Sequence, residues 1–320
     1  MNTRNTKTAV IILLIIANIF FIYNILILKI RSENIPSEMI DNAVSILGKN
    51  GLIAEKSKIP AKKPGKVIYE GVYEGVYSQD TFDDIVKNFS EISDEEFNET
   101  DYMPVPVGIS CTAGNYMFTF TVADYFKINI IETSYIDAEM DFKKLEEETE
   151  IKKEVLSENG INDVSRKEIK KAENIIRSFI KKYHGQDVKL SFEIKGFSKD
   201  KQKNCDCVLI RQTVDGLQVD SHTAYIEIQD GKVKYFSGEW YFGGFTAKHP
   251  MPLLDSVNIL FKCMEMDGNI IQESGRLIGM DLEYTVIPHD TNKFYFVPSW
   301  QIIFDNDKKL SYNMINGGKN

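Results

Sequence analysis

An apolar run near the N-terminus constrains this chain more than any other feature. The segment from Ala9 to Leu28, AVIILLIIANIFFIYNILIL, has twenty residues and carries no charge. Twenty helical residues at about 1.5 Å each reach about 30 Å, which is the thickness of a bilayer's hydrocarbon core. A secretory signal peptide would have a shorter apolar core of about 7 to 15 residues and a small-residue cleavage site. This run continues instead into Lys29 and Arg31, so the sequence predicts an uncleaved single-pass anchor.

The charges that flank the run give a weak indication of orientation. Arg4 and Lys7 precede it, and Lys29 and Arg31 follow it, so the two sides carry equal basic side chains. The free N-terminal amine adds a positive charge to the short side, and positive flanks stay in the cytoplasm. We therefore expect a single-pass protein of the cell membrane, in contact with the lipid bilayer. Its N-terminus would be cytoplasmic and its large C-terminal part extracytoplasmic.

One face of the expected anchor helix carries polar and small side chains. At 100° per residue, six positions fall within an arc of about 120°. Ala17 permits close helix approach, and an Asn side chain can donate to a partner helix in lipid. We predict a partner-contact face on this helix, although Asn24 is also placed to reach headgroup water. The predicted contact residues are Leu14, Ala17, Asn18, Phe21, Asn24 and Ile25.

Composition predicts a folded, acidic protein beyond the anchor. The chain has 38 basic and 47 acidic residues and a formal net charge of −9. An acidic surface repels phosphates, which argues against nucleic acid as a partner. With about 290 residues after the anchor, two domains are expected rather than one. The predicted segments are 1–32 for the cytoplasmic N-terminus and anchor, 33–160 for an N-terminal α+β domain with an acidic linker, and 161–320 for a C-terminal α+β domain.

The N-terminal domain reads as a small α+β unit. Helical spacing predicts helices over 36–50 and 80–89. Strands are expected over 66–77, 116–122 and 125–132. Between Glu139 and Gly160 the chain carries eight acids and four lysines in twenty-two residues. That segment is typical of a solvated helix or linker, and an acidic docking surface is the alternative.

Two helix-plus-sheet units are expected in the C-terminal domain. Ser165 and Glu168 have capping-box spacing before an amphipathic helix that ends at Gly185. Asp230-Gly231 predicts a two-residue hairpin, because a type I′ turn needs positive φ at both positions. A second helix from Pro252 and three more strands would repeat the pattern. The predicted strands cover 188–197, 207–214, 218–228 and 232–242 in the first unit, and 277–287, 294–304 and 310–315 in the second.

Short motifs in this order resemble the YycI family, membrane-anchored partners of the WalK/WalR two-component system in Gram-positive bacteria. The similar stretches are Thr6–Thr8, Asn18–Phe20, Tyr23, Pro60, Val297–Ile302 and Tyr312–Gly317, and Gln212–Val219 resembles the strand-turn-strand of PepSY-like domains. The resemblance implies an N-terminal transmembrane helix, an α+β domain and two PepSY-like helix-plus-antiparallel-sheet units. It implies contact regulation of a WalK-like sensor histidine kinase, with the outer domains pairing with a YycH-like protein.

No sequence motif indicates catalysis. His184, His222, His249 and His289 are isolated and match neither a zinc-protease helix nor a nucleophile elbow. Cys205-Asp206-Cys207 with His222 is a weak metal pattern, because a second cysteine pair is missing. We expect a regulator that is not an enzyme and that has no cofactor or metal. A PepSY-type ligand-binding or protease-inhibiting module and an anchored cell-envelope hydrolase are the alternatives.

Overall fold

The fold was analysed in a computed structural model of the chain. It describes residues 33–65, 67–72, 101–105, 108–113, 115–121, 127–135, 142–161, 164–184, 190–241, 245–248, 252–274, 276–290, 293–306 and 308–320. These residues divide into two compact units. The first takes its described residues from Met1–Val67, Pro250–Leu282 and Pro298–Asn320, and the second from Ile68–His249 and Glu283–Val297.

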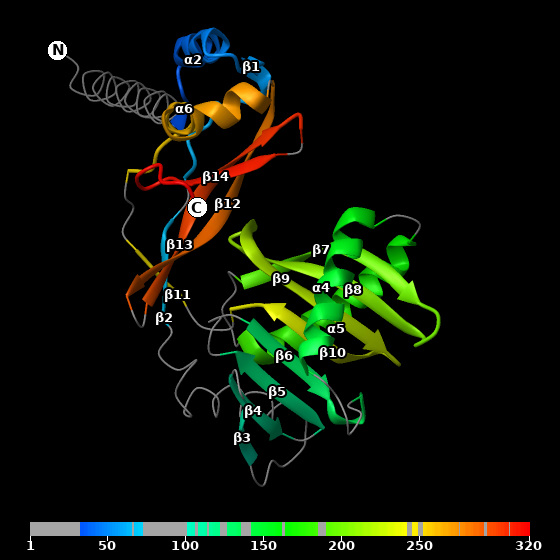
Figure 1. Ribbon diagram of the computed structural model, residues 1–320. Helices are drawn as coiled ribbons and strands as arrows, with labels where there is room; N and C mark the ends of the chain where they lie inside the picture. Colours follow the sequence, from blue (N-terminus) through cyan, green and yellow to red (C-terminus); the bar gives the residue numbers. More distant parts are fainter. Residues whose placement is uncertain are drawn as a thin grey trace, which may run out of the picture. The chain divides into compact units, whose positions relative to one another are not determined.

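The first unit combines residues from Glu33 onward with C-terminal residues around one apolar core (Figure 1). Its helices α2 (Ser37–Lys49) and α6 (Ser256–Ser274) contact each other. The helical spacing of Ile40, Ala43 and Leu47 buries one face of α2. The remaining elements are β1 (Ile53–Ala54), the 3-10 helix η1 (Lys56–Lys58), β14 (Lys309–Asn313), the first part of β12 (Arg276–Asp290) and the last part of β13 (Lys293–Phe304).

The second unit contains an antiparallel sheet with a helix on each face. Its ladder β7-β8-β9-β10-β6-β5-β4-β3 is antiparallel throughout. The strands are β2 (Tyr69–Val72), β3 (Asp101–Val105), β4 (Gly108–Ala113), β5 (Tyr116–Thr121), β6 (Lys127–Glu132), β7 (Leu190–Asp200), β8 (Cys205–Val214), β9 (Leu217–Gln229), β10 (Lys232–Glu239) and β11 (Phe245–Ala247). The helices are η2 (Thr133–Tyr135), α4 (Phe142–Asn159) and α5 (Arg166–His184).

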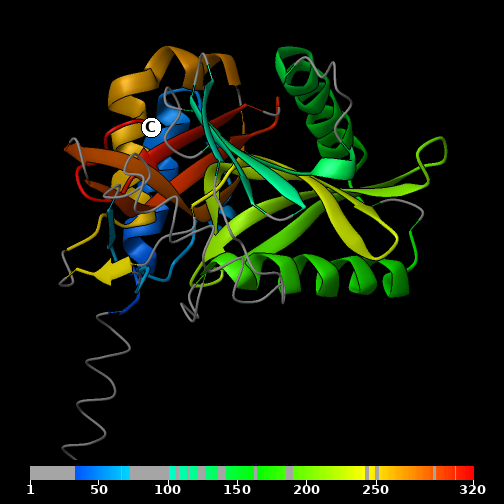
Figure 2. The ribbon, with the colours of Figure 1, turned by 90° about the horizontal axis from the view of Figure 1, so that it is seen from below.

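Helices α4 and α5 cover opposite faces of this sheet (Figure 2). Alternation along β8 explains the two layers, because successive side chains of a strand point to opposite faces. Val208 and Ile210 belong to the same core as the apolar stripe of α5. Cys207 belongs to the other core, with Leu156 of α4. The sheet is therefore buried on both faces where it holds the site described below.

Local predictions for the second unit are confirmed. Ser165 and Glu168 make a capping box: Ser165 N–H donates to Glu168 Oε2 at 3.2 Å, and Glu168 N–H donates to Ser165 Oγ at 3.3 Å. Asp230 and Gly231 have φ of 51° and 77° between β9 and β10, which is the backbone that a type I′ turn requires. The predicted helix over 80–89 lies outside the described residues.

The predicted fold class is wrong. Hydrogen bonds link the described strands into a mixed sheet of 14 strands, so the chain is β-rich and is not built from two separate PepSY-like helix-plus-sheet units. The reason is that the expected second unit does not close on itself. Strand β13 pairs with β2 from the N-terminal half as well as with β14, and β12 pairs with β1. The apolar pattern predicts the positions of β12, β13 and β14, but it does not predict which strands they pair with.

The contact units also differ from the predicted segments 33–160 and 161–320. Strand β6 lies before Gly160 in sequence, yet it pairs with β10 over five residue pairs from Tyr235–Ile131 to Glu239–Lys127. Helix α2 packs with α6 in the first unit. The boundary expected near Gly160 therefore falls inside the second unit.

The structure also corrects the predicted localisation. No helix among the described residues is long and apolar enough to cross a membrane, which contradicts the prediction of a single-pass membrane protein with an N-terminal transmembrane helix. The segment 9–28, to which that helix was assigned, lies outside the described residues.

Candidate functional site

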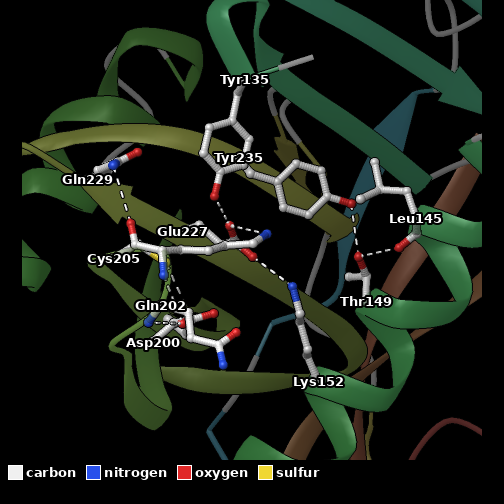
Figure 3. Close-up of polar contacts among 12 residues, drawn as sticks. Tyr135, Leu145, Thr149, Lys152, Asp200, Gln202, Cys205, Glu227, Gln229 and Tyr235 are labelled. Atoms are coloured by element: carbon white, nitrogen blue, oxygen red, sulfur yellow. Dashed lines mark hydrogen bonds and ion pairs between the residues drawn. The ribbon is translucent and has the colours of Figure 1, made fainter. Parts of the chain in front are cut away.

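A row of polar side chains crosses three neighbouring strands beneath α4. Glu227 of β9 is the direct partner of Cys207 on β8 and of Tyr235 on β10. Residues that face each other across a ladder share a face of the sheet. Strand alternation adds Tyr225 and Cys205 to that face. We call Glu227, Tyr225, Tyr135, Lys152, Cys205, Cys207, Tyr235 and Thr149 the Glu227 cluster. Figure 3 labels all of these residues except Tyr225 and Cys207.

Glu227 is the centre of this cluster and is almost fully buried, with 1% of its surface exposed. Tyr225 donates a hydrogen bond to its Oε1 at 2.7 Å, and Lys152 Nζ from α4 donates to the same oxygen at 2.9 Å. Tyr135 of η2 donates to Oε2, and Lys203 Nζ lies 3.7 Å from that oxygen. Three elements of the chain thus converge on one carboxylate, as Figure 3 shows for Tyr135 and Lys152.

These donors keep Glu227 ionised. Burial alone would raise the pKa of its carboxyl, but hydrogen bonds from Tyr135, Lys152 and Tyr225 outweigh burial and hold the pKa below its usual value. Burial would lower the pKa of Lys152, and the hydrogen bond to Glu227 reverses that effect and raises it. A carboxylate whose oxygens are occupied in this way is a fixed anion. It serves to dock α4 and η2 rather than to transfer protons.

A second contact fixes α4 to the sheet. Thr149 Oγ1 donates to Leu145 O at 2.7 Å within the helix and lies 3.0 Å from the Tyr235 hydroxyl. A bulge in β7 between Ile194 and Gly196 lets the helix approach closely. A Cβ built at Gly196 would lie 2.4 Å from the backbone oxygen of Leu156. The inner face of α4 is therefore fully engaged with the sheet.

The two thiols of Cys205 and Cys207 lie side by side in the cluster. Their Sγ atoms are 3.8 Å apart, and the Tyr225 hydroxyl lies 3.1 Å from Cys207 Sγ. The Cys205 thiol holds the pKa of Cys207 below its usual value, at about 7, against the opposing effect of burial. The same contact raises the pKa of Cys205. Because they are two residues apart on β8, both thiols share one face of the sheet.

The outer face of α4 combines apolar and acidic side chains. Ile151 and Val155 are 61% and 48% exposed, and their spacing of four residues places them on one side of the helix. Taking 100° per residue, the acidic positions next to them face the same way. These exposed residues are Glu147, Glu148, Glu154 and Glu158. We call this surface, with Ile151 and Val155, the α4 outer face.

The two histidines whose side chains the structure describes, His222 and His289, do not join the cluster. His222 is buried, and its Nδ1 lies 2.8 Å from Gln212 Oε1. Burial lowers its pKa to about 3, so it is neutral at physiological pH. His289 is exposed and its ring lies 4.6 Å from the ring of Tyr295. His249 lies outside the described residues, and of His184 only the helical backbone is described.

The predicted partner-contact residues Leu14, Ala17, Asn18, Phe21, Asn24 and Ile25 all lie outside the described residues. Within the described part of the chain, no three His, Cys, Asp or Glu side chains gather in a way that could hold a metal ion.

Sequence reasoning missed the Glu227 cluster, although one signal was present. The run from Ala224 to Ile228 is buried throughout, and strands covered on both faces read as continuous apolar runs. An acid inside such a run requires charged or hydrogen-bonding partners. Those partners, Tyr135 and Lys152, are distant in sequence, which hid the site.

Comparisons with known proteins give no family. No family model matches the chain, and no curated protein matches it significantly. Among solved structures, the chain is similar to the crystal structure of an uncharacterized protein from Eubacterium rectale ATCC 33656. That likeness has 9% identity and a TM-score of 0.46, and it covers 84% of this chain and 89% of the other. Such a likeness assigns neither a function nor a site to this protein.

Proposed function

We propose that this chain is a non-catalytic regulator that binds a sensor histidine kinase and changes its output by protein contact. The resemblance to the YycI family suggests the class of partner, a WalK-like kinase, and a YycH-like protein as a second component. The observation that carries the proposal is the α4 outer face. The opposite face of α4 is packed against the sheet, so the helix holds its outer face in a fixed position.

The chemistry of the α4 outer face indicates what it binds. Two exposed branched side chains are separated by one helical turn, a spacing that suits helix-to-helix or helix-to-groove contacts. Four exposed glutamates surround them, so the complementary surface is basic with an apolar centre. We assign this role to a basic amphipathic segment of the kinase. Electrostatic complementarity of this kind makes the association faster at low salt.

The roles of Lys152 and Lys153 strengthen this assignment. Lys152 points inward to Glu227, and Lys153 pairs with Glu150 at 2.8 Å. These two lysines therefore pair within the chain and do not neutralise the four glutamates around Ile151 and Val155.

The first prediction tests the surface directly. We expect Ile151→Ser combined with Val155→Ser to weaken binding to the purified, detergent-solubilised kinase by at least about tenfold, because central apolar contacts contribute most of the free energy of an interface. Binding is measured by titration calorimetry, together with the rate of kinase autophosphorylation. The wild-type protein should change that rate, and the double variant should not.

Ile53→Ser provides the matched control. Ile53 is 60% exposed on β1 in the first unit, so its replacement removes an exposed apolar side chain like Ile151 from the unit that does not contain α4. We expect this variant to bind like the wild type. The proposal is abandoned if the wild-type protein does not bind the kinase, or if Ile53→Ser and the α4 double variant lose binding equally.

A further inference from the structure

The Cys205 and Cys207 thiols are placed for a reaction that the proposed function does not use. They are two residues apart on β8, both are buried, and their sulfur atoms are 3.8 Å apart. A disulfide has an S–S distance of about 2.05 Å, so closure requires each sulfur to move by about 0.9 Å. Side-chain rotation alone does not close the bond, because a disulfide also needs its β-carbons about 3.5 to 4.5 Å apart, so the backbone at one of the two cysteines must move as well.

The backbone next to Cys205 can supply this shift. Cys205 is the first residue of β8 and follows an exposed turn, Lys201–Asn204, in which Asn204 has φ of 49°. In an extended strand, alternate α-carbons are about 6.7 Å apart, at the upper end of the range that disulfides span. Bonds formed at that limit are readily reduced. The position of Cys205 at the start of β8 therefore favours a disulfide that forms and is reduced reversibly.

We propose that Cys205 and Cys207 form a peroxide-reactive dithiol that closes to a reversible intramolecular disulfide. The inference stands independently of the proposed kinase contact. It rests on the sulfur–sulfur contact, on the position at the strand end, and on the groups around Cys207. Among these groups, the Tyr225 hydroxyl lies 3.1 Å away and Lys152 supplies a positive charge from α4, while the Glu227 carboxylate opposes ionisation of the thiol.

The chemistry has two balanced steps. The Cys207 thiolate attacks one oxygen of hydrogen peroxide, the O–O bond breaks, and the products are Cys207 sulfenic acid and hydroxide. The Cys205 thiol then attacks that sulfur, an S–S bond forms, and water leaves. Two electrons pass from the sulfur atoms to the peroxide. Cys207 is the attacking residue because its thiolate is the stabilised one, and Cys205 resolves the intermediate.

A proteolytic fragment of the wild-type protein gives the direct test. Trypsin cleaves after Lys203 and Arg211, so both cysteines fall in one peptide, Asn204–Arg211. The reduced native protein is treated with hydrogen peroxide, denatured in the presence of N-ethylmaleimide, digested with trypsin and analysed by mass spectrometry. We expect this peptide to lose two hydrogen atoms and to take no maleimide, and dithiothreitol to restore two maleimide sites. Two maleimides after peroxide treatment, or a link to a peptide that holds Cys111 or Cys263, would overturn the proposal.

The synthetic peptide Asn204–Arg211 is the matched control for the role of the fold. It has the same two thiols without Tyr225 or Lys152. Near pH 7 we expect the folded protein to oxidise about tenfold faster, because a larger fraction of its attacking thiol is ionised. An equal or slower rate in the folded protein would show that the structure does not activate the pair.

Two single variants assign the roles. Cys205→Ser should stop at a Cys207 sulfenic acid that dimedone captures, and Cys207→Ser should leave Cys205 unreacted over the same time. Circular dichroism confirms that each variant is folded, and the wild-type digest remains decisive if one is not. Oxidation of Cys205 at the wild-type rate in Cys207→Ser would contradict the assignment of the attacking residue.

Discussion

At the scale of single residues, the hydrogen-bonded ion pair of Glu227 with Lys152 attaches α4 to the sheet. In Glu227→Gln an amide N–H₂ group replaces one carboxylate oxygen. The side chains that donated hydrogen bonds to that oxygen then face another donor and have no acceptor. We expect the free energy of unfolding to fall by about 2 to 4 kcal/mol, the range for breaking a buried, hydrogen-bonded charge cluster. Urea unfolding measures the loss. Glu154→Gln on the exposed side of α4 is the control and should change stability by less than about 0.5 kcal/mol. Equal effects of the two variants would mean that the cluster does not hold the helix.

The pH dependence of this difference has a definite sign. The pKa of Glu227 is lower in the folded protein than in the unfolded chain, so its contribution is complete above the unfolded pKa. It is lost as the pH falls through the folded pKa. The stability difference between the wild type and Glu227→Gln should therefore be constant near neutrality and shrink in acid.

Residue-level features were predictable where the signal is local. Ser165 with Glu168, and Asp230 with Gly231, each fix the backbone within four residues, and both predictions are confirmed. Glu227 shows the opposite case. Its partner Tyr135 is 92 residues away in sequence, and neither residue type nor spacing indicates that pairing.

At the scale of elements, the contact of α4 with the bulge of β7 is the most sensitive to substitution. Gly196→Ala would place a methyl group against the Leu156 backbone, so α4 or β7 must shift. We expect a loss of about 1 to 3 kcal/mol, as for other overpacked sites. Hydrogen exchange should be faster along α4 and remain unchanged in α5. Gly279→Ala is the control, because a Cβ there meets nothing within 4 Å. Unchanged exchange along α4 in Gly196→Ala would show that the close approach is not required.

Strand positions were predictable because alternation of apolar and polar residues is a local pattern. The expected strands over 207–214 and 218–228 became β8 and β9 with ends shifted by one or two residues. The pairing of β6 with β10 joins residues that are about 100 positions apart, and no pattern in either strand specifies that choice. The acidic segment before Gly160 was expected to be either a solvated helix or linker or a docking surface. In the structure most of this segment forms α4, and one face of that helix packs against the sheet.

At the scale of the whole chain, the predicted fold class is wrong, because the chain is not a series of helix-plus-sheet units that follow one another in sequence. The first unit takes residues from both the N-terminal and C-terminal parts of the sequence. Buried residues of α2, such as Leu47, share a core with Trp300 and Tyr312. Sequence order suggests that neighbouring segments pack together. In the folded chain, helices and strands pack where their apolar faces are complementary, whatever their distance in sequence. The resemblance to the YycI family remains a prediction about function.

Site-specific photocrosslinking tests the central claim that the α4 outer face binds a sensor histidine kinase. A photoreactive benzoylphenylalanine replaces Ile151 in one protein and Ile53 in another, both expressed in cells at equal abundance. After irradiation, mass spectrometry identifies the attached chain. We predict a crosslink to a sensor histidine kinase from position 151, competed by untagged wild-type protein, and none from position 53. The absence of a kinase crosslink from position 151, or an equal crosslink from position 53, would contradict the account.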